Sequence, residues 1–142
     1  MFNELNRHFS WRGACLMAGR YEDLANHYVL PFRADLAGRK VSLSAKDDLI
    51  LQLHRTRLAL LQRGTVALRP LISAIELPAS GQRVWLQWQE LRSDGKIGER
   101  ADVVYDTRNE DGWIKVVEAT YTSLIVDIFG RRGALLGQQR SR

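Results

Sequence analysis

The second half of the chain alternates between apolar and polar positions in four successive runs, and short turn sequences separate these runs. The runs cover residues 65–77, 82–92, 97–108 and 113–126. A period of two residues is typical of strands that bury one face of a sheet. Four such runs with short connections predict an antiparallel meander.

The first half of the chain has the spacing of helices. Residues 10–28 predict a helical region that is interrupted at Gly19, where one helix ends and a short second helix begins. Four apolar residues of that second helix are spaced i, i+3, i+4 and i+7: Tyr21, Leu24, Ala25 and Tyr28. Pro31 then stops the helix.

A short hairpin and a long helix connect the two halves. Residues 32–36 and 39–43 predict the hairpin, with its tight turn at Ala37-Gly38. Ser44 and Asp47 resemble a capping box, which opens a helix that runs to about residue 63 and ends at Gly64. We expect its apolar face to consist of Leu49, Ile50, Leu53, Leu60 and Leu61.

The second and third strands have a register that follows from their turn. If Asp94-Gly95 is a two-residue turn, three apolar pairs face each other: Val84 and Tyr105, Leu86 and Val103, Trp88 and Ala101. All six residues then share one face of the sheet, because paired residues point to the same side. The opposite face carries Gln87, Gln89, Arg100 and Asp102, so a slip by one residue would exchange the two faces.

The preceding hairpin is predicted in the same way from a turn at residues 79–80. This register places Leu71 opposite Trp88, and Arg69 opposite Glu90, on the inner face. Pro70 then points outward.

The last turn leaves two alternatives for the final strand. A loop of two or four residues within 109–112 places Ile114, Val116, Glu118 and Thr120 inside. A loop of three or five residues places Trp113, Val117, Ala119 and Tyr121 inside instead. We favour the first alternative, which puts the Glu118 carboxylate on the inner face.

Composition and charge indicate one folded domain with a basic end. The 142 residues are 45% apolar and 26% charged, which is ordinary for a globular protein. The net charge is +5, but four arginines in the last twelve residues leave only +1 for residues 1–130. We therefore expect a domain at 1–128, a flexible tail at 129–142, and no nucleic-acid binding by the folded part.

The single cysteine and the N-terminal sequence indicate the cellular compartment. Cys15 is the single cysteine, and no apolar stretch approaches the roughly 20 residues of a membrane span. The N-terminus has no charged leader followed by an apolar run. We expect a cytoplasmic protein with a core thiol and no membrane contact.

The order of helices, hairpin, long helix and meander resembles that of the nuclear-transport-factor-2-like, SnoaL-like superfamily. Residues 18–28, Ala-Gly-Arg-Tyr-Glu-Asp-Leu-Ala-Asn-His-Tyr, resemble its helix break and short helix with a final aromatic residue. Residues 112–117, Gly-Trp-Ile-Lys-Val-Val, are similar to the start of its last strand. The resemblance implies an α+β fold in which N-terminal helices pack in a curled antiparallel sheet, the cystatin-like cone.

What the resemblance implies about function is an apolar pocket in the cone, and often a homodimer through the outer face of the sheet. Its members include cofactor-independent isomerases, cyclases and dehydratases as well as noncatalytic binding modules, and fold alone does not choose among them. The acidic base of the isomerases would fall near Asp35. We expect Phe32, Ala34 and Leu36 to share the buried side and Asp35 to point outward, so this role is not carried over.

Four residues are the candidates for chemistry under this reading. Glu90 and Glu118 would act as acid or base in an apolar pocket, and Tyr105 would donate to a developing oxyanion. His27 lies near the expected opening of the pocket and would act as a base or contact the ligand. The predicted ligand-binding residues are Trp88, Leu71, Leu86 and Val103.

Each candidate also has a purely structural explanation. Glu90 would form an ion pair with Arg69, Glu118 would face solvent, Tyr105 would pack in the core, and His27 would cap a helix. The three histidines lack metal-ligand spacing, so we predict no metal and no cofactor. Trp85 on the outer face is the predicted anchor of a homodimer, and a noncatalytic interaction module is the alternative to a small-molecule-binding protein.

Overall fold

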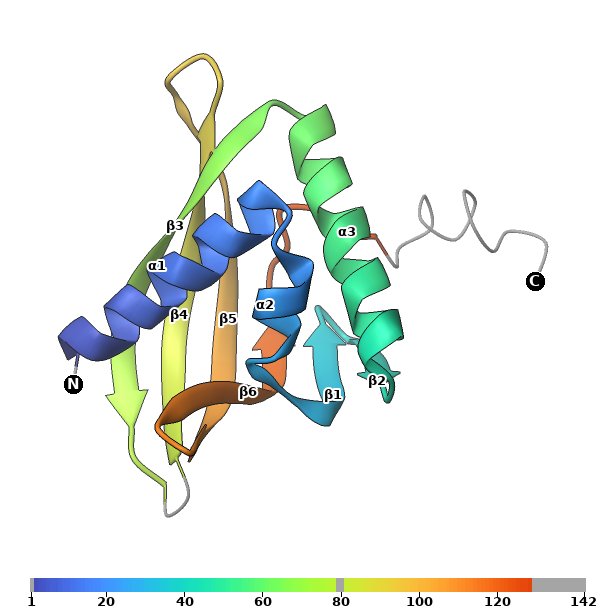
Figure 1. The fold of residues 1–142 in the computed structure, drawn as a ribbon. Coiled ribbons are helices and arrows are strands. Elements are labelled where there is room, and N and C mark those ends of the chain that lie inside the picture. The colour runs from blue at the N-terminus through green and yellow to red at the C-terminus, as the bar shows by residue number, and fades with distance from the viewer. Residues whose placement is uncertain (1, 79–80, 129–142) are drawn as a thin grey trace.

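The computed structural model describes residues 2–78 and 81–128. Its elements, in chain order, are α1 (Phe2–Ala18), α2 (Tyr21–Ala25), β1 (Tyr28–Leu36), β2 (Arg39–Leu43), α3 (Lys46–Gln62), β3 (Thr65–Glu76), β4 (Gly81–Arg92), β5 (Ile97–Glu110) and β6 (Trp113–Tyr121) (Figure 1). The six strands form one sheet in the order β2-β1-β6-β5-β4-β3. Neighbouring strands are antiparallel, except that β1 and β6 are parallel.

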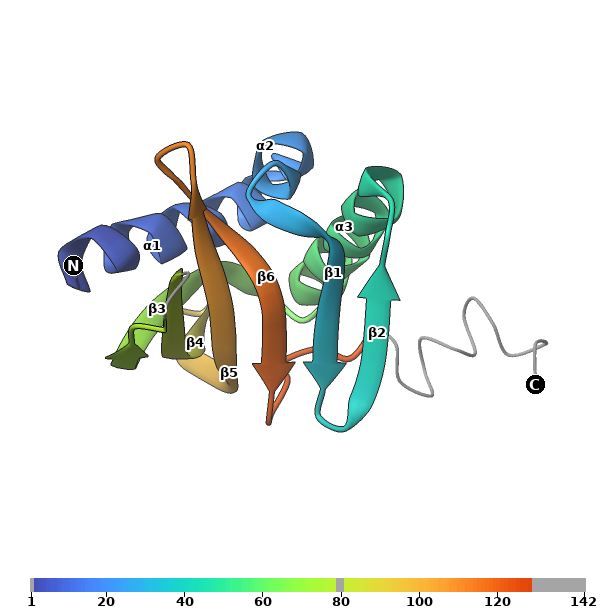
Figure 2. The same ribbon diagram turned by 90° about the horizontal axis from the view of Figure 1, so that it is seen from below.

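The helices lie on the concave side of this curled sheet (Figure 2). Leu5 and Phe9 of α1 are fully buried in the same core as the inner faces of β4 and β5. Gly13 allows this close approach, because a Cβ atom there would lie 3.1 Å from both the Leu68 carbonyl oxygen and the Trp88 ring. The predicted α+β cone is therefore confirmed.

The predicted register of β4 and β5 is confirmed for the three apolar pairs, but the predicted two-residue turn at Asp94-Gly95 is wrong. A bulge between Gln89 and Leu91 pairs Leu91 with Ile97 and makes the loop one residue longer. Val84 pairs with Tyr105, Leu86 with Val103, and Trp88 with Ala101. All six side chains are buried, with exposed fractions between 0 and 7%. The register follows from the sequence because one apolar face is continuous along both strands.

The predicted register of β3 and β4 is wrong beyond its first pairs. Ile75 pairs with Val84 as expected, but a β-bulge between Ile72 and Ala74 shifts the rest of β3 by one residue. Pro70 consequently lies opposite Trp88, and Leu71 turns to the outer face, where it is 41% exposed. A bulge inserts one residue into one strand, and so exchanges the two faces of the strand from that point.

The last strand combines both alternatives. Asp111-Gly112 form a two-residue turn, and the pairing of Thr107 with Val116 keeps Val116 inside, fully buried. A second bulge follows between Val116 and Glu118. Beyond it Ala119 and Tyr121 lie inside, and Glu118 lies outside, so the predicted inner position of Glu118 is wrong.

The predicted helices differ from the structure mainly at their boundaries. α1 begins at Phe2 rather than at residue 10, and β1 begins at Tyr28, where a helix end was expected. The predicted capping box does not form, because Ala45 is the N-cap and makes no side-chain cap bond. Leu49 and Leu60 are buried as expected, whereas Leu61 is 42% exposed.

The predicted division into a domain and a tail lies only partly within the described residues. The structure describes the chain to residue 128, so the predicted tail and the predicted turn at 79–80 lie outside the described residues. In the described part of the chain, no helix has both the length and the apolar character needed to cross a membrane.

Candidate functional site

A cavity of about 200 Å³ lies between the helices and the inner face of the sheet. Its walls are mostly apolar and come from all three helices, from all six strands of the described sheet, and from the segment after β6. Phe32, Ala34 and Leu36 line it from β1, as their alternation predicted. Asp35 instead accepts a hydrogen bond from the Gly38 N–H at 2.8 Å and lies 3.6 Å from Lys40 Nζ.

Two tyrosine hydroxyls and an indole form a hydrogen-bonded relay in the wall of this cavity. Trp88 Nε1 donates to the hydroxyl of Tyr105 at 2.7 Å, and that hydroxyl lies 2.9 Å from the hydroxyl of Tyr121. All three residues line the cavity. Burial raises the pKa of Tyr105 to about 12 and that of Tyr121 well above its usual range, so both hydroxyls remain protonated.

The relay contains one hydrogen-bond donor more than its two internal hydrogen bonds require. Trp88 Nε1 and the two hydroxyls supply three polar hydrogens, and the two bonds of the relay consume two of them. Whichever hydroxyl donates to the other, one O–H remains for an acceptor in the cavity. The relay can therefore donate to an oxygen atom of a bound molecule.

Arg12 of α1 adds a buried positive charge to the same cavity. The residue is only 4% exposed and lines the cavity wall. Its Nη1 donates to the His27 carbonyl oxygen at 3.1 Å, and its guanidinium lies 4.4 Å from the centre of the Tyr28 ring. Nη2 is buried and has no hydrogen-bond partner among the described residues.

Gln52 of α3 supplies a second unsatisfied atom. Its Oε1 is buried without a hydrogen-bond partner among the described residues, and the residue lines the cavity. Buried polar atoms without partners are rare in native proteins, because each costs about 1–3 kcal/mol. Two residues of an otherwise apolar cavity wall, Arg12 and Gln52, thus each have a buried polar atom whose hydrogen-bonding capacity the described residues do not use.

Glu90 does not lie in this cavity, and its predicted partner Arg69 is wrong. The Glu90 side chain is fully buried and binds Arg63, with Nε–Oε2 at 2.6 Å and Nη2–Oε1 at 2.9 Å. The Thr65 hydroxyl and the backbone N–H of Glu99 also donate to it. The Arg63 hydrogen bonds lower the pKa of Glu90 to about 2, against the effect of burial, so its carboxylate is ionised and fully bonded.

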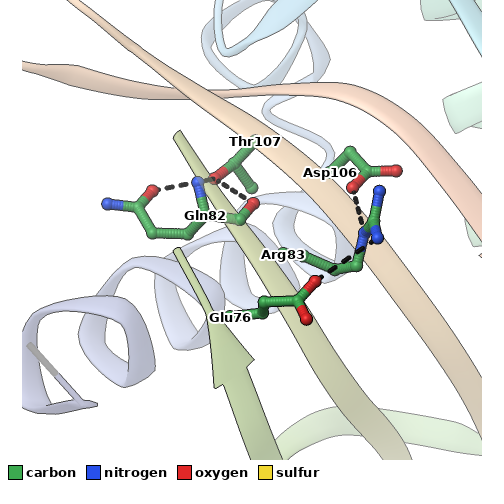
Figure 3. Close-up of polar contacts among 5 residues, drawn as sticks. All are labelled: Glu76, Gln82, Arg83, Asp106 and Thr107. Carbon is green, nitrogen blue, oxygen red and sulfur yellow. Dashed lines mark hydrogen bonds and ion pairs between the residues drawn. The ribbon is translucent and has the colours of Figure 1, made fainter. Parts of the chain in front are cut away.

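Glu118 lies on the outer face, beside a polar cluster of β4 and β5. Its side chain is 41% exposed, and its Oε2 lies 3.9 Å from Arg33 Nε. Its register neighbour Asp106 accepts from Arg83 at 2.7 Å, and Arg83 also approaches Glu76 at 3.4 Å (Figure 3). The same figure shows Thr107 bonded to Gln82. The Arg83 contacts form a structural network at the surface, whereas Thr107 and Gln82 form a separate, buried pair.

His27 lies outside the cavity, in an aromatic stack. Its ring is parallel to that of Trp113, with an interplanar angle of 6° and centroids 4.5 Å apart, and meets Trp11 edge-on. Its Nδ1 lies 3.2 Å from the Asp23 carbonyl oxygen. Burial lowers the pKa of His27, so its ring is neutral near pH 7. The hydrogen bond between His27 and Arg12 therefore involves the backbone carbonyl of His27 and not its imidazole ring.

The predicted ligand-binding residues separate into three groups. Trp88 lines the cavity, Leu86 and Val103 belong to the buried core but do not line the cavity, and Leu71 lies on the outer face. Leu71 is displaced by the bulge in β3. Cys15 is buried, as expected for a core thiol. Residues 2–78 and 81–128 contain no group of three or more histidine, cysteine, aspartate or glutamate side chains that could hold a metal ion.

Arg12 and Gln52 were missed at the sequence level, but Arg12 left a signal. Leu5, Phe9, Arg12 and Leu16 follow the i, i+4, i+7, i+11 spacing of one helix face. A helix that starts at residue 10 omits Leu5 and Phe9, and so hides the fact that Arg12 lies within an apolar stripe.

Comparisons with known proteins establish the fold. No protein-family description matches the chain, and no curated protein matches its sequence significantly. A nuclear transport factor 2-like protein with a cystatin-like fold from Novosphingobium aromaticivorans matches with a TM-score of 0.67 and 14% identity, over 96% of this chain and 88% of that one. The chain therefore has the cystatin-like fold of nuclear transport factor 2-like proteins.

Two further solved structures match the chain with lower sequence identities. ActVI-ORFA from Streptomyces coelicolor matches with a TM-score of 0.62 and 10% identity, over 89% of this chain and 96% of that one. A protein named as a candidate scytalone dehydratase from Novosphingobium aromaticivorans matches with a TM-score of 0.56 and 12% identity, over 84% and 81% of the two chains. Identities this low show the shared fold alone.

Proposed function

We propose that this protein binds a small, mostly apolar molecule in the cavity of the cone. The observation that carries the proposal is the relay of Trp88, Tyr105 and Tyr121, which leads into an apolar cavity of about 200 Å³ with one hydrogen to spare. Apolar pockets with a few convergent polar groups are typical ligand sites. A cavity of roughly 150 Å³ accommodates benzene, so this cavity fits a molecule of about one or two rings.

A cofactor-independent isomerase, cyclase or dehydratase reaction is a more specific form of this proposal. The spare hydroxyl hydrogen would stabilise an oxyanion as it develops on the substrate. A base is also needed, and neither Glu90 nor Glu118 reaches the cavity. Among the described residues that line it, Asp127 is the carboxylate, and it accepts from Arg39 Nη1 at 3.0 Å. We therefore assign the proton acceptor of this reaction class to Asp127.

Binding of 2-naphthamide, a neutral two-ring probe, tests the proposed function. Ala34→Trp fills the cavity from β1, whereas Ala45→Trp adds the same side chain at an exposed position outside the cavity. By isothermal titration calorimetry, we expect the unmodified protein and Ala45→Trp to bind the probe, and Ala34→Trp to bind at least tenfold more weakly. Equal affinity in all three proteins would overturn the proposal, as would a failure of the unmodified protein to bind either 2-naphthamide or its carboxylate, 2-naphthoate.

A noncatalytic homodimer module is the second candidate, and the outer face of the sheet favours it. Leu71, Trp85, Gln87, Val104 and Thr120 line a shallow hollow on this face. Leu71 is 41% exposed there, which adds apolar area beside Trp85. We expect Trp85→Ala to halve the mass measured by light scattering while the circular dichroism spectrum is retained. An unchanged mass would count against this interface.

A further inference from the structure

Arg12 is a buried cation for which the described residues provide no carboxylate. It is 4% exposed, and none of the ion pairs in residues 2–78 and 81–128 includes it. Burial of a charge without a counter-charge is strongly unfavourable. The arrangement therefore needs a compensating group.

The groups around the guanidinium are neutral and satisfy only part of it. Nη1 donates to the His27 carbonyl oxygen at 3.1 Å and lies 3.4 Å from His8 Nε2. Burial lowers the pKa of His8 to about 3, so its ring is a neutral acceptor near pH 7. The Tyr28 ring covers one face of the guanidinium at 4.4 Å. Nη2 has no hydrogen-bond partner in the described part of the chain.

The rest of the cavity does not neutralise this charge. The positive field of Arg12 opposes the rise in the pKa of Tyr105 and Tyr121, yet burial dominates and both hydroxyls stay protonated. Asp127 lies in the wall of the same cavity, with its carboxylate on Arg39 at 3.0 and 3.1 Å. The cavity thus combines hydrogen-bond donors from the relay with a cation that no carboxylate of residues 2–78 and 81–128 neutralises.

We propose that the ligand of this cavity is a small ring-containing anion, whose negatively charged oxygen accepts a hydrogen bond from Arg12 Nη2. This inference rests on the proposed function and narrows its ligand class to carboxylates and similar oxyanions. Gln52 Oε1 accepts a hydroxyl or amine hydrogen of the same ligand, and the relay hydroxyl donates to the ligand's oxygen. A ring with one acidic group and one donor group satisfies both orphaned atoms.

A matched pair of probes tests the charge without any substitution. 2-Naphthoate and 2-naphthamide share their ring system and differ in the charge of one group. Charge-assisted hydrogen bonds in a desolvated site are stronger than neutral ones. We therefore expect the unmodified protein to bind 2-naphthoate about tenfold more tightly than 2-naphthamide, or better, in calorimetric titrations at pH 7 and fixed ionic strength.

Variants then identify the cation that is responsible. Arg12→Gln should remove the preference for the carboxylate, so that its affinities for the two probes lie within about threefold of each other. Arg7→Gln removes the same charge from an exposed position of α1 and should retain the preference, as should Arg12→Lys in part. Circular dichroism and thermal melting confirm that each variant is folded before it is titrated.

The outcomes separate this inference from the proposal on which it rests. Equal affinity for the two probes in the unmodified protein, with loss of both in Ala34→Trp, would overturn the anion preference and retain the binding function. A preference that survives Arg12→Gln would overturn the role of Arg12. Binding of neither probe would overturn both proposals.

Discussion

The hydroxyl of Tyr105 lies 2.9 Å from the hydroxyl of Tyr121, although the two residues are not register partners. Tyr105 pairs with Ala119, and Tyr121 pairs with Val103, so the tyrosines are diagonal neighbours on one face. The bulge between Val116 and Glu118 creates this relationship, because without it Tyr121 would face outward. One inserted residue in β6 therefore places the end of the relay in the cavity.

The two tyrosines should differ in their contribution to stability. Tyr105→Phe removes the acceptor of the buried Trp88 N–H, which leaves a desolvated donor unpaired at a cost of about 1–3 kcal/mol. Tyr121→Phe leaves the bond between Trp88 and Tyr105 intact and should cost only about 0.5–1.5 kcal/mol. Urea denaturation measures both free energies of unfolding.

Tyr21→Phe is the control for these two substitutions. The Tyr21 hydroxyl lies 3.1 Å from His54 Nδ1, a contact between exposed groups, so its loss should change the free energy of unfolding by less than about 0.5 kcal/mol. A larger loss in Tyr121→Phe than in Tyr105→Phe would contradict the assignment of the Tyr105 hydroxyl as the acceptor of the buried Trp88 N–H.

The bulges mark the limit of what the sequence could predict about the sheet. β4 and β5 each have one continuous apolar face, so their register follows from that pattern, although a bulge between Gln89 and Leu91 makes the actual loop one residue longer than predicted. In β3, Leu71 and Ile72 are adjacent and both apolar, and in β6 the same holds for Val116 and Val117. Adjacent apolar residues satisfy either phase, so the pattern cannot show where an extra residue is inserted.

The site itself was predictable only in part, for a different reason. Trp88 and Tyr105 were found because they belong to the regular part of the sheet. Arg12 and Gln52 come from two helices whose relative position depends on packing against the sheet. Their common feature, a buried atom without a partner, exists only in the folded chain.

The identity of the Glu90 partner makes a direct prediction. Arg63→Gln breaks a buried ion pair and should destabilise the protein by about 3 kcal/mol or more, because the fully buried Glu90 carboxylate loses its cation. Arg69→Gln should cost less than about 1 kcal/mol, because the described Arg69 contact is with the amide of Gln89. Chemical denaturation of both variants checks the prediction, and the reverse order of stabilities would restore Arg69 as the partner.

Replacement of Gly98 by a larger residue should destabilise the protein, because the added side chain would meet the Glu90 carboxylate. A Cβ atom at residue 98 would collide with Glu90 Oε1 and lie 2.9 Å from Arg92 Cδ. Glu90 cannot move aside cheaply, because Arg63, Thr65 and the Glu99 N–H hold both of its oxygens. Gly98→Ala should therefore cost about 1–3 kcal/mol.

A double-mutant cycle isolates this collision. Glu90→Ala removes the carboxylate, so the double variant with Gly98→Ala should be more stable than the sum of the two single losses predicts, by at least about 1 kcal/mol. Additive losses would show that Gly98 acts through its backbone or through Arg92 rather than through Glu90.

Stability should fall as the pH is lowered, in two steps with different causes. Burial, together with the Arg12 charge and His27, lowers the pKa of His8 from 6.5 to about 3, so between these values the unfolded chain binds a proton that the folded chain does not. The free energy of unfolding therefore decreases from about pH 6.5 downward. The pKa of Glu90 is lowered from 4.5 to about 2, so its ion pair contributes fully above pH 4.5 and is lost from there toward pH 2.

His8→Asn and Glu90→Gln should separate these two steps. Urea denaturation at half-unit intervals from pH 3 to pH 8 gives the slope of stability against pH, which is at most about 1.4 kcal/mol per pH unit for one proton. His8→Asn should flatten the curve between pH 6.5 and 4.5, where Glu90 does not titrate, and Glu90→Gln should flatten it only below pH 4.5. The pKa of His27 is also lowered, so His27 should contribute to the slope in the same direction. A slope that remains in His8→Asn and disappears in the double variant with His27→Asn would be assigned to His27. An unchanged slope in His8→Asn would mean that the ring beside Arg12 titrates normally, and that His8 carries a positive charge next to the guanidinium below pH 6.5.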